Sequence, residues 1–362
     1  MGRLCVGLIG PGLIGKSLVQ QLGQQTPYLR DKLGIHLSLV AVANSKRQLL
    51  ADVDAAPLQL AGDWLERLQL QGAPLDLPAF ARHVSAPGGW GVIVDCTASD
   101  SVPDHYESWL GSGLHVVTPN KKYSAALRAA RGGGARLLAE ASVGAGLPVL
   151  STLRDLVETG DQVTRIEGIL SGTLSYIFNT FRPGTPFSSV VAAAKDLGYT
   201  EPDPREDLSG MDVARKVVIL ARACGLSTEL EDLRVESLVP EPLQALPGAD
   251  EFMARLPEFD AEMAQRADAA AAEGGVLRYV GVVDVASGTA SVTLQSFPAD
   301  HAFAQLQGSD NLIAFTTQRY AATPLIVRGP GAGAAVTAAG VFGDILQIAR
   351  SVAPRPAEAG KA

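Results

Sequence analysis

The sequence of 362 residues has little cysteine and histidine, with three of the former and five of the latter. Cys5, Cys96 and Cys224 are odd in number and far apart, without a CxxC pair or neighbouring histidines. This pattern argues against a disulfide framework and a zinc site. We expect three buried thiols in a protein of a reducing compartment.

Positive charge and long apolar runs are also scarce. The chain has 30 Lys and Arg against 38 Asp and Glu, a net charge of −8, and no basic stripe. A net-acidic surface repels phosphate backbones, so no nucleic-acid partner is expected. We find no apolar run of membrane length and no Arg/Ser-rich presequence, which predicts a cytoplasmic protein with no membrane partner.

The remaining composition is that of a folded chain. Hydrophobic residues make up 47% and charged residues 19%, which excludes a disordered protein. The length predicts two or three domains.

Short apolar strands alternate with helices in the first part of the chain, which is typical of a parallel sheet with right-handed crossovers. We predict strands at residues 4–9, 35–43, 91–95 and 115–118, and helices at 16–22 and 106–110.

The pattern changes near residue 150, where successive strands follow one another across short turns and predict an antiparallel or mixed sheet. Helices are expected at about 188–198, 209–224 and 250–273, and strands near 276–284, 290–296, 311–318 and 324–329. The predicted fold is therefore α/β: a Rossmann-type domain, residues 1–148 with a returning C-terminal helix at 331–352, and an α+β domain on a mixed sheet, residues 149–330. Residues 353–362 are expected to form a frayed tail.

Residues 10–15 read GPGLIG, directly after the first predicted strand and before a helix. In a GxGxxG turn, Gly10 permits the tight bend, Gly12 lets a pyrophosphate approach the backbone, and Gly15 lets helix and strand pack closely. The context favours dinucleotide binding over a chance glycine turn.

The second strand ends at Asn44, and Ser45, Lys46 and Arg47 follow, so the only charges there are positive. NAD selectivity requires a carboxylate at this place for the ribose hydroxyls, whereas cations suit the phosphate of NADP. NADP(H) is therefore the expected cofactor, with NAD(H) possible. Lys46 and Arg47 as merely solvated loop charges remain the alternative.

Lysines and carboxylates supply the candidate chemistry. Lys121 and Lys122 follow the fourth predicted strand, at the sheet edge where ligands lie, although a lysine pair in a loop is commonly surface charge. Residues 198–216 contain five carboxylates and end on Lys216. Helical spacing places Lys216 beside the apolar stripe and Asp212 one turn earlier on the same flank.

Two interpretations of this pair stay open. It is either an ordinary i, i+4 ion pair or a proton donor beside a carbonyl that receives hydride, since lysine is protonated at neutral pH. The carboxylates suit a substrate ammonium group; a divalent metal is less favoured because prolines interrupt them and histidine ligands are lacking. Residues 140–147 read as a glycine hinge on pattern alone.

Long blocks of the chain resemble homoserine dehydrogenases. The matching blocks, in order along almost the whole chain, are GLIGPGLIG (7–15), VDCTAS (94–99), VVTPNKK (116–122), VGAGLPV (143–149), LSGTLSYIF (170–178), GYTEPDPREDLSGMDVARK (198–216), VLRYVG (276–281) and GAGAAVTAAGVFGD (331–344). The resemblance implies NAD(P)-dependent interconversion of L-aspartate 4-semialdehyde and L-homoserine, on the pathway to threonine, methionine and isoleucine.

The resemblance also implies the site residues. Lys216 matches the family's proton donor and Lys121 a second lysine at the reaction centre. Substrate contacts are implied for Glu201, Asp212, Asp207 and a turn at Gly172 and Thr173. Cofactor contacts are expected from Gly10, Gly12, Leu13, Ile14, Gly15, Asn44, Lys46, Arg47, Thr97, Ala98, Lys121 and Gly333. The resemblance replaces the hinge at residues 140–147 with a sodium-type cation site at Glu140 and the carbonyls of Val143, Ala145 and Leu147.

The resemblance further implies a homodimer joined through the sheet of the second domain. Glu206 stands where many relatives have Asp. No kinase-like segment precedes the matching blocks and none follows them as a regulatory domain, so a short, monofunctional form is expected. Two other functions stay open: a dehydrogenase for another small aldehyde or hydroxy acid, and an NADP-binding regulator without catalysis. The presence of Lys121, Asp212 and Lys216 argues against the regulator.

Overall fold

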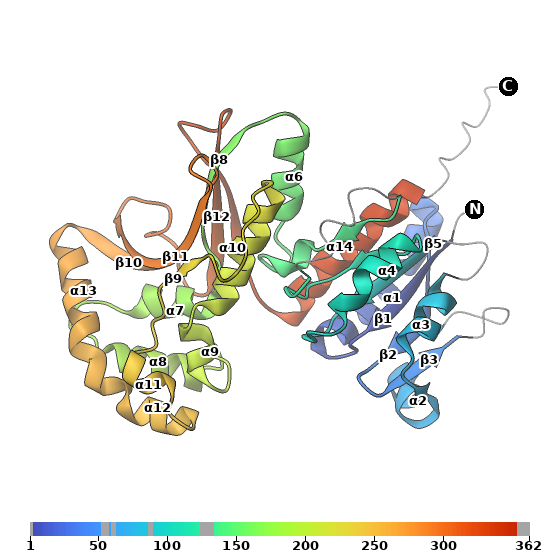
Figure 1. The fold of residues 1–362 in the computed structure, drawn as a ribbon, viewed down its shortest axis with the longest axis horizontal. Helices are drawn as coiled ribbons and strands as arrows, with labels where there is room; N and C mark the ends of the chain where they lie inside the picture. The colour runs from blue at the N-terminus through green and yellow to red at the C-terminus, as the bar shows by residue number, and fades with distance from the viewer. Residues whose placement is uncertain (1–2, 52–57, 59–62, 86–89, 124–133, 353–362) are drawn as a thin grey trace. The chain divides into compact units, whose positions relative to one another are not determined.

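The computed structural model describes residues 3–51, 58, 63–85, 90–123 and 134–352. The chain forms two compact units (Figure 1). Unit 1 comprises Met1–Gly146 and Gly333–Ala362, and unit 2 is Leu147–Ala332. These borders lie two residues from the domain limits expected from the sequence. The expected tail at 353–362 lies outside the described residues.

Unit 1 contains a seven-stranded sheet in the order β4-β3-β2-β1-β5-β6-β7. The strands are β1 (Arg3–Ile9), β2 (His36–Ala43), β3 (Arg47–Leu50), β4 (Ala73–Pro74), β5 (Trp90–Asp95), β6 (His115–Val117) and β7 (Leu137–Leu138). β1 pairs in parallel with β2 and β5, and the parallel pairing continues through β6 to β7. The four strands predicted from apolar runs are confirmed. The other three have two to four residues each, too few to give a pattern.

Among its described residues, unit 1 has the helices α1 (Leu13–Leu33), α2 (Trp64–Gln71), α3 (Leu77–Val84), η1 (Pro103–His105), α4 (Tyr106–Gly111), η2 (Glu140–Ser142) and α14 (Ala334–Val352). α1 is much longer than the predicted 16–22 and ends at Gly34, whose left-handed φ of 64° closes the helix. Although it contains Pro27, the helix continues through this residue.

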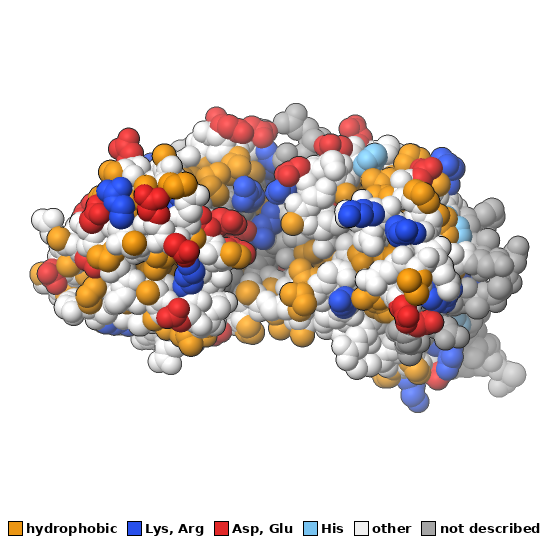
Figure 2. Space-filling model, turned by 90° about the horizontal axis from the view of Figure 1, so that it is seen from below, with side chains coloured by type: hydrophobic (Ala, Val, Ile, Leu, Met, Phe, Trp, Pro, Cys, Tyr) orange, Lys and Arg blue, Asp and Glu red, His pale blue; other side chains and the backbone are white. Residues whose placement is uncertain are grey.

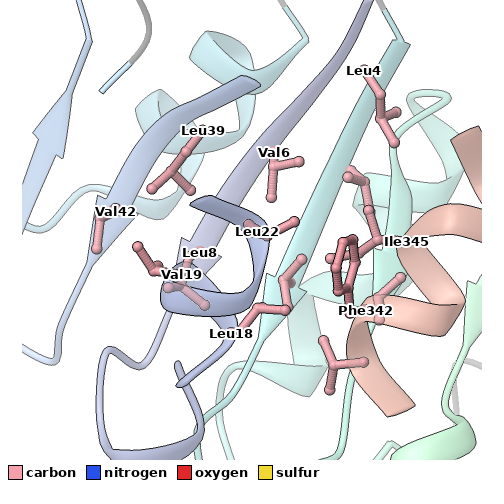
Figure 3. Close-up of a cluster of buried hydrophobic side chains, with 14 of the residues drawn as sticks. Leu4, Val6, Leu8, Leu18, Val19, Leu22, Leu39, Val42, Phe342 and Ile345 are labelled. Atoms are coloured by element: carbon pink, nitrogen blue, oxygen red, sulfur yellow. The ribbon is translucent and has the colours of Figure 1, made fainter. Parts of the chain in front are cut away.

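A hydrophobic core forms where α1 and α14 pack against each other and against the sheet. In Figure 3, Leu18 and Leu22 of α1 and Phe342 and Ile345 of α14 point into one cluster with side chains of β1 and β2. Each such buried side chain contributes about 1.5–3 kcal/mol to folding. Segments from both ends of the chain thus build one core.

α14 corrects the expectation that no apolar segment reaches membrane length. With 19 residues and a mean hydropathy of 1.2, it is long and apolar enough to cross a membrane by length and composition. Val341, Ile345 and Ile348 of this helix are nevertheless fully buried within unit 1. The helix has the apolar face of a core element.

Unit 2 contains a six-stranded sheet in the order β13-β12-β8-β10-β11-β9. Its strands are β8 (Val163–Ile169), β9 (Arg234–Val235), β10 (Gly275–Asp284), β11 (Thr289–Pro298), β12 (Asp310–Thr317) and β13 (Leu325–Pro330). All pairs are antiparallel except β9 with β11, so the sheet is mixed, as predicted. β8, which lies between β10 and β12, was not predicted from the sequence.

The helices of unit 2 are α6 (Leu150–Glu158), α7 (Gly172–Thr180), α8 (Phe187–Asp196), α9 (Pro204–Leu208), α10 (Met211–Ala223), α11 (Glu241–Gln244), α12 (Ala249–Arg255), η3 (Leu256–Phe259) and α13 (Asp260–Ala272). The predicted single helix at 250–273 is wrong, because a 3-10 turn that contains Pro257 separates α12 from α13. α10 lies against β10, where a Cβ at Gly281 would stand 2.5 Å from Val217 Cγ2.

Candidate active site

The three glycines at the start of α1 have three different surroundings. Gly10 has a φ of 89°, and a Cβ there would stand 2.8 Å from Thr97 Cγ2. A Cβ at Gly15 would overlap the carbonyl oxygen of Gly10, whereas a Cβ at Gly12 would meet nothing within 4 Å. The turn therefore needs Gly10 for its bend, Gly15 for close packing, and leaves open space at Gly12 in front of the helix N-terminus. This geometry fits a pyrophosphate group.

Leu13 and Ile14 form the first turn of α1 but lie differently. Leu13 is 80% exposed, while Ile14 packs against the core of unit 1. Of these two expected cofactor contacts, Leu13 is thus open to solvent, while Ile14 is part of the packing of unit 1.

The loop after β2 is held by the side chain of Asn44. Its Oδ1 accepts from the backbone N–H groups of Lys46 and Arg47, both at 2.8 Å. The guanidinium of Arg47 donates to the carbonyl of Gly72 at 2.7 Å, and Lys46 is exposed. Of the two expected cations, Arg47 thus has a structural bond and Lys46 points to solvent.

Lys121 and Lys122 follow β6. Lys122 Nζ donates to Ala98 O at 3.2 Å and pairs with Asp100 at 2.6 Å. Lys121, the residue before it, is partly buried. Lys122 therefore joins this loop to the segment that contains Thr97 and Ala98, two of the expected cofactor contacts.

Lys216 is buried on α10 and its ammonium is bound on two sides. Nζ donates to the carbonyl of Leu170 at 2.6 Å and pairs with Asp212 Oδ2 at 2.8 Å. The Lys216 side chain is 9% exposed and that of Asp212 is 46% exposed. Helical periodicity placed Lys216 at the border of the buried stripe; the fold buries it further, because the end of β8 supplies the Leu170 carbonyl.

The other expected substrate residues meet around Asp207. Thr173 Oγ1 lies 2.9 Å from Asp207 Oδ1 and 2.6 Å from the carbonyl of Tyr199, and the backbone N–H of Glu201 donates to Asp207 Oδ2 at 2.8 Å. Gly172 and Thr173 begin helix α7 and do not form the turn that was expected. The Glu201 residue is exposed.

Burial raises the pKa of the Asp207 carboxyl above its ordinary value. The hydrogen bonds from Glu201 and Thr173 lower this pKa, and the nearby charge of Asp212 raises it. By contrast, Asp203 caps α9 and binds the guanidinium of Arg205, which lowers the pKa of Asp203. Of the acidic residues between 198 and 216, Asp203 thus serves the fold.

The segment expected to bind a cation has an unusual backbone. Gly144 and Ala145 have φ values of 79° and 56°, and the N–H of Glu140 donates to Asp344 Oδ2 at 2.8 Å. The carbonyl of Leu147 accepts the N–H of Val149. Within the described residues, no group of three or more His, Cys, Asp or Glu is suited to a metal. The expected ligands are one carboxylate and three carbonyls, so the cation site stays a prediction.

The structure groups most of the predicted residues by unit. The cofactor-side residues and Lys121 lie in unit 1, with Gly333 at the start of its second segment, and Lys216, Asp212, Asp207, Glu201 and Thr173 lie in unit 2. On the face in Figure 2, Lys and Arg side chains are interspersed with Asp, Glu and apolar side chains.

Sequence reasoning missed Asp95, Tyr106 and Asn120, whose side chains meet at the carboxyl ends of β5 and β6. A polar residue at the end of an otherwise apolar strand was the available signal, because ligands gather at that sheet edge.

Two family models match the chain. The model described as "Homoserine dehydrogenase, NAD binding domain" matches residues 10–142, and the model described as "Homoserine dehydrogenase" matches residues 148–346.

Named relatives match almost the whole chain. A bifunctional aspartokinase/homoserine dehydrogenase 1 of Zea mays is 53% identical over 95% of the chain. The chain spans only 38% of the length of that relative. The homoserine dehydrogenases of Schizosaccharomyces pombe and Emericella nidulans are 43% and 44% identical, with 96% and 95% of the chain and 96% and 97% of each relative covered.

Solved structures share the fold. A Candida auris protein of unknown function has a TM-score of 0.89 at 40% identity, with 97% of this chain and 99% of that chain covered. A putative homoserine dehydrogenase of Archaeoglobus fulgidus has a TM-score of 0.76 at 24% identity, with 96% and 99% covered. The two family models span nearly all of the chain, and the two fungal relatives match 95% or more of it; the chain belongs to the homoserine dehydrogenase family.

Proposed function

We propose that this chain reduces L-aspartate 4-semialdehyde to L-homoserine with NADPH, and runs the reverse oxidation, in threonine, methionine and isoleucine biosynthesis. The observation that supports it most directly is the buried ammonium of Lys216, held by Asp212 and the Leu170 carbonyl. This group lies in the unit that the homoserine dehydrogenase family model matches.

The dinucleotide occupies unit 1 in this proposal. The open space at Gly12 and the N–H groups of the first turn of α1 receive the pyrophosphate, with Gly10, Gly15, Leu13 and Ile14 around it. Thr97, Ala98 and Gly333 provide further contacts. The exposed Lys46 binds the ribose phosphate of NADP, while Asn44 and Arg47 hold the turn that presents it.

When bound, the reduced nicotinamide supplies a hydride to the aldehyde carbon. Lys216 holds a proton at Nζ and transfers it to the aldehyde oxygen as negative charge develops there, because lysine is protonated at neutral pH. Asp212 keeps the ammonium oriented, and Lys121 adds a second positive charge. Preorganised charge of this kind lowers the barrier by several kcal/mol in many enzymes.

The acidic residues of unit 2 hold the substrate. Glu201 is exposed at the end of the segment that Asp207 fixes, and its carboxylate suits the ammonium group of the amino acid. Thr173 and Gly172, at the N-terminus of α7, complete this side. A fixed substrate keeps the reacting atoms aligned, which is a large part of catalysis.

The assembly and surroundings of the enzyme complete the proposal. We propose a cytoplasmic homodimer joined through the sheet of unit 2, with a sodium ion bound by Glu140 and the carbonyls of Val143, Ala145 and Leu147. A carboxylate with several carbonyl oxygens suits a hard cation.

Replacing Lys216 tests the reaction. We expect Lys216→Ala to lower kcat by about 10²–10⁴, the usual contribution of a positioned proton donor, with an unchanged NADPH Kd. The assay follows nucleotide absorbance with aspartate semialdehyde, homoserine and other small aldehydes as substrates. If Lys216→Ala turns over as fast as the wild type, Lys216 is not the proton donor. A preference of the wild type for another aldehyde would indicate a related dehydrogenase. No turnover in the wild type would indicate a binding protein.

Replacing Lys46 tests the cofactor preference. We expect Lys46→Ala to raise the NADPH Kd about tenfold, the loss of one charge-assisted hydrogen bond, and to leave the NADH Kd unchanged. Lys32→Ala, an exposed lysine in the last turn of α1, is the matched control. An equal effect on both nucleotides contradicts a role for Lys46 at the phosphate.

A further inference from the structure

Asp95 is a fully buried carboxyl at the carboxyl end of β5, with 0% exposure. Three donors converge on it: the N–H of Thr97 at 2.8 Å on Oδ1, and the Tyr106 hydroxyl at 2.6 Å and Asn120 Nδ2 at 3.3 Å on Oδ2. A buried carboxylate is stable only when such bonds replace its hydration. Burial raises its pKa, and these hydrogen bonds oppose the increase.

The bonds of Asp95 continue into the loop after β6. Thr118 Oγ1 donates to the carbonyl of Asp95 at 2.9 Å and accepts the N–H of Asn120 at 2.9 Å. Tyr106 Oη also lies 3.1 Å from Thr118 Oγ1. The start of this loop is thereby tied to the end of β5.

Asn120 fixes the loop from its other side. Nδ2 donates to the carbonyl of Ser99 at 2.9 Å as well as to Asp95, and Oδ1 accepts the N–H of Lys122 at 3.0 Å. The Asn120 side chain therefore forms hydrogen bonds on both sides of Lys121: it anchors residue 120 itself, and it binds the backbone N–H of Lys122. The backbone of Lys121 is held from the residue before it and from the residue after it.

The other end of this network is the segment expected to contact the cofactor. Residues 96 and 97 lie against Gly10, where a Cβ would stand 2.9 Å from Cys96 O. Asp95 binds the N–H of Thr97 in the same segment. The Asp95 carboxyl thus connects residues 96 and 97, which lie against the glycine turn, with the loop that carries Lys121.

We propose that Asp95, Tyr106 and Asn120 are positioning residues that set the place of Lys121 against the cofactor segment 96–100. The inference rests on the proposed role of Lys121 in the reaction. Asp95 does this because an ionised carboxylate accepts from all three donors in different directions. An amide at this position keeps the volume but replaces one accepting oxygen with a donor that faces Tyr106 and Asn120 or Thr97.

A double-mutant cycle tests the coupling to Lys121. We expect Asp95→Asn to lower kcat about 10- to 100-fold in the wild-type background, as a misplaced catalytic group does, and to have little further effect in the Lys121→Ala background. The NADPH Kd and the KM for the semialdehyde should change much less than kcat. Tyr106→Phe, which removes only the hydroxyl, should show the same coupling with a smaller loss and takes the place of Asp95→Asn if that variant does not fold.

Asp161→Asn is the matched control for a purely structural effect. Asp161 is also a buried carboxyl that accepts from three donors, the Thr317 hydroxyl and the N–H groups of Gln162 and Arg319, but it lies in unit 2, just before β8 and beside the end of β12. The Asp161→Asn variant should have a lower unfolding temperature than the wild type and an unchanged kcat.

The outcomes separate the two proposals. If Lys121→Ala strongly lowers kcat and Asp95→Asn lowers it further by the same factor as in the wild-type background, the two losses are additive. That result overturns the positioning network and leaves the proposed function standing. Full turnover in Lys121→Ala overturns the role of Lys121 itself and the network with it.

Discussion

At the scale of single residues, burial and hydrogen bonding give similar side chains different roles. Asp203 and Asp207 are four residues apart, yet Asp203 binds Arg205 and has a lowered pKa, whereas Asp207 is half-buried, accepts from Thr173 and has a raised pKa. The adjacent Lys121 and Lys122 also differ, since Lys121 is half-buried while Lys122 pairs with Asp100 at 2.6 Å. The sequence identified the acidic cluster and the lysine pair, but such partners come from other elements.

The raised pKa of Asp207 predicts a pH dependence of stability. A carboxyl whose pKa is higher in the folded than in the unfolded state contributes stability that is fully present below the unfolded value of 3.8 and is lost as pH rises through the folded value. Asp207→Asn lacks this ionisation. Relative to Asp207→Asn, the wild type should therefore lose free energy of unfolding as the pH rises above 3.8, until the pH has passed the raised pKa of the folded state.

Urea unfolding of both proteins at each pH measures this difference, since the other carboxyls cancel in the comparison. Asp203→Asn is the contrasting variant: the pKa of Asp203 is lowered in the folded state, so relative to Asp203→Asn the wild type should gain free energy of unfolding as the pH rises toward 3.8. A difference that stays constant with pH, or has the opposite sign, contradicts the assigned pKa direction.

At the scale of elements, glycines show where the backbone needs close contact. α14 contains two such residues with opposite surroundings: a Cβ at Gly340 would stand 2.6 Å from Ala145 O, whereas Gly343 is exposed and has open space around it. The sequence shows two glycines in one helical pattern and does not distinguish them. The distinction comes from the chain at residues 141–146, which lies against one side of the helix.

These two glycines give a matched pair of predictions. Gly343→Ala should stabilise the protein by about 0.5–1 kcal/mol, because alanine restricts the unfolded chain and favours the helix. Gly340→Ala should destabilise it by about 1–3 kcal/mol, because its Cβ overlaps the Ala145 carbonyl. Thermal and urea unfolding measure both changes; equal effects of the two variants would show that α14 does not pack as described.

The glycine turn at α1 gives a second contrast at this scale. Gly15→Ala should lower stability because its Cβ overlaps Gly10 O, whereas Gly12→Ala should cost at most about 1 kcal/mol, the usual loss of a good N-cap, and weaken NADPH binding through the pyrophosphate. Unfolding midpoints and the NADPH Kd separate the two effects. Unchanged NADPH affinity in Gly12→Ala would count against a pyrophosphate at this turn.

At the scale of the whole molecule, unit 1 is built from both ends of the chain and unit 2 from one continuous stretch. α14 adds Val341, Ile345 and Ile348 to the core that α1 and the sheet form, and it is the last described helix of the chain. Unit 1 is therefore incomplete until its C-terminal segment is present.

Fragments test this organisation. A fragment of residues 147–332 should unfold cooperatively by itself, because its sheet and helices are contiguous. A fragment of residues 1–146 should lack a cooperative transition, because about 1.5–3 kcal/mol per missing core side chain exceeds the margin of a small domain. Joining residues 333–362 to it through a flexible linker should restore the transition. Calorimetry and circular dichroism measure each fragment; a cooperative transition of 1–146 alone contradicts the prediction.

The sequence by itself determined the features that depend on near neighbours along the chain. Apolar runs, the GPGLIG turn and helical periodicity are local, so strands β1, β2, β5 and β6, the start of α1 near the glycines and the flank position of Lys216 followed from them. The long matching blocks added the family, which the structure and the relatives bear out.

Only the tertiary structure decided the features that depend on distant segments. β8 is polar in part and becomes a central strand only because β10 and β12 hydrogen-bond to both of its edges. The Leu170 carbonyl lies 46 residues from Lys216, and the Asp95 network joins three segments. Such pairings are set by the packing of whole elements, because the free energy of burying a polar group depends on the partners that the fold places beside it.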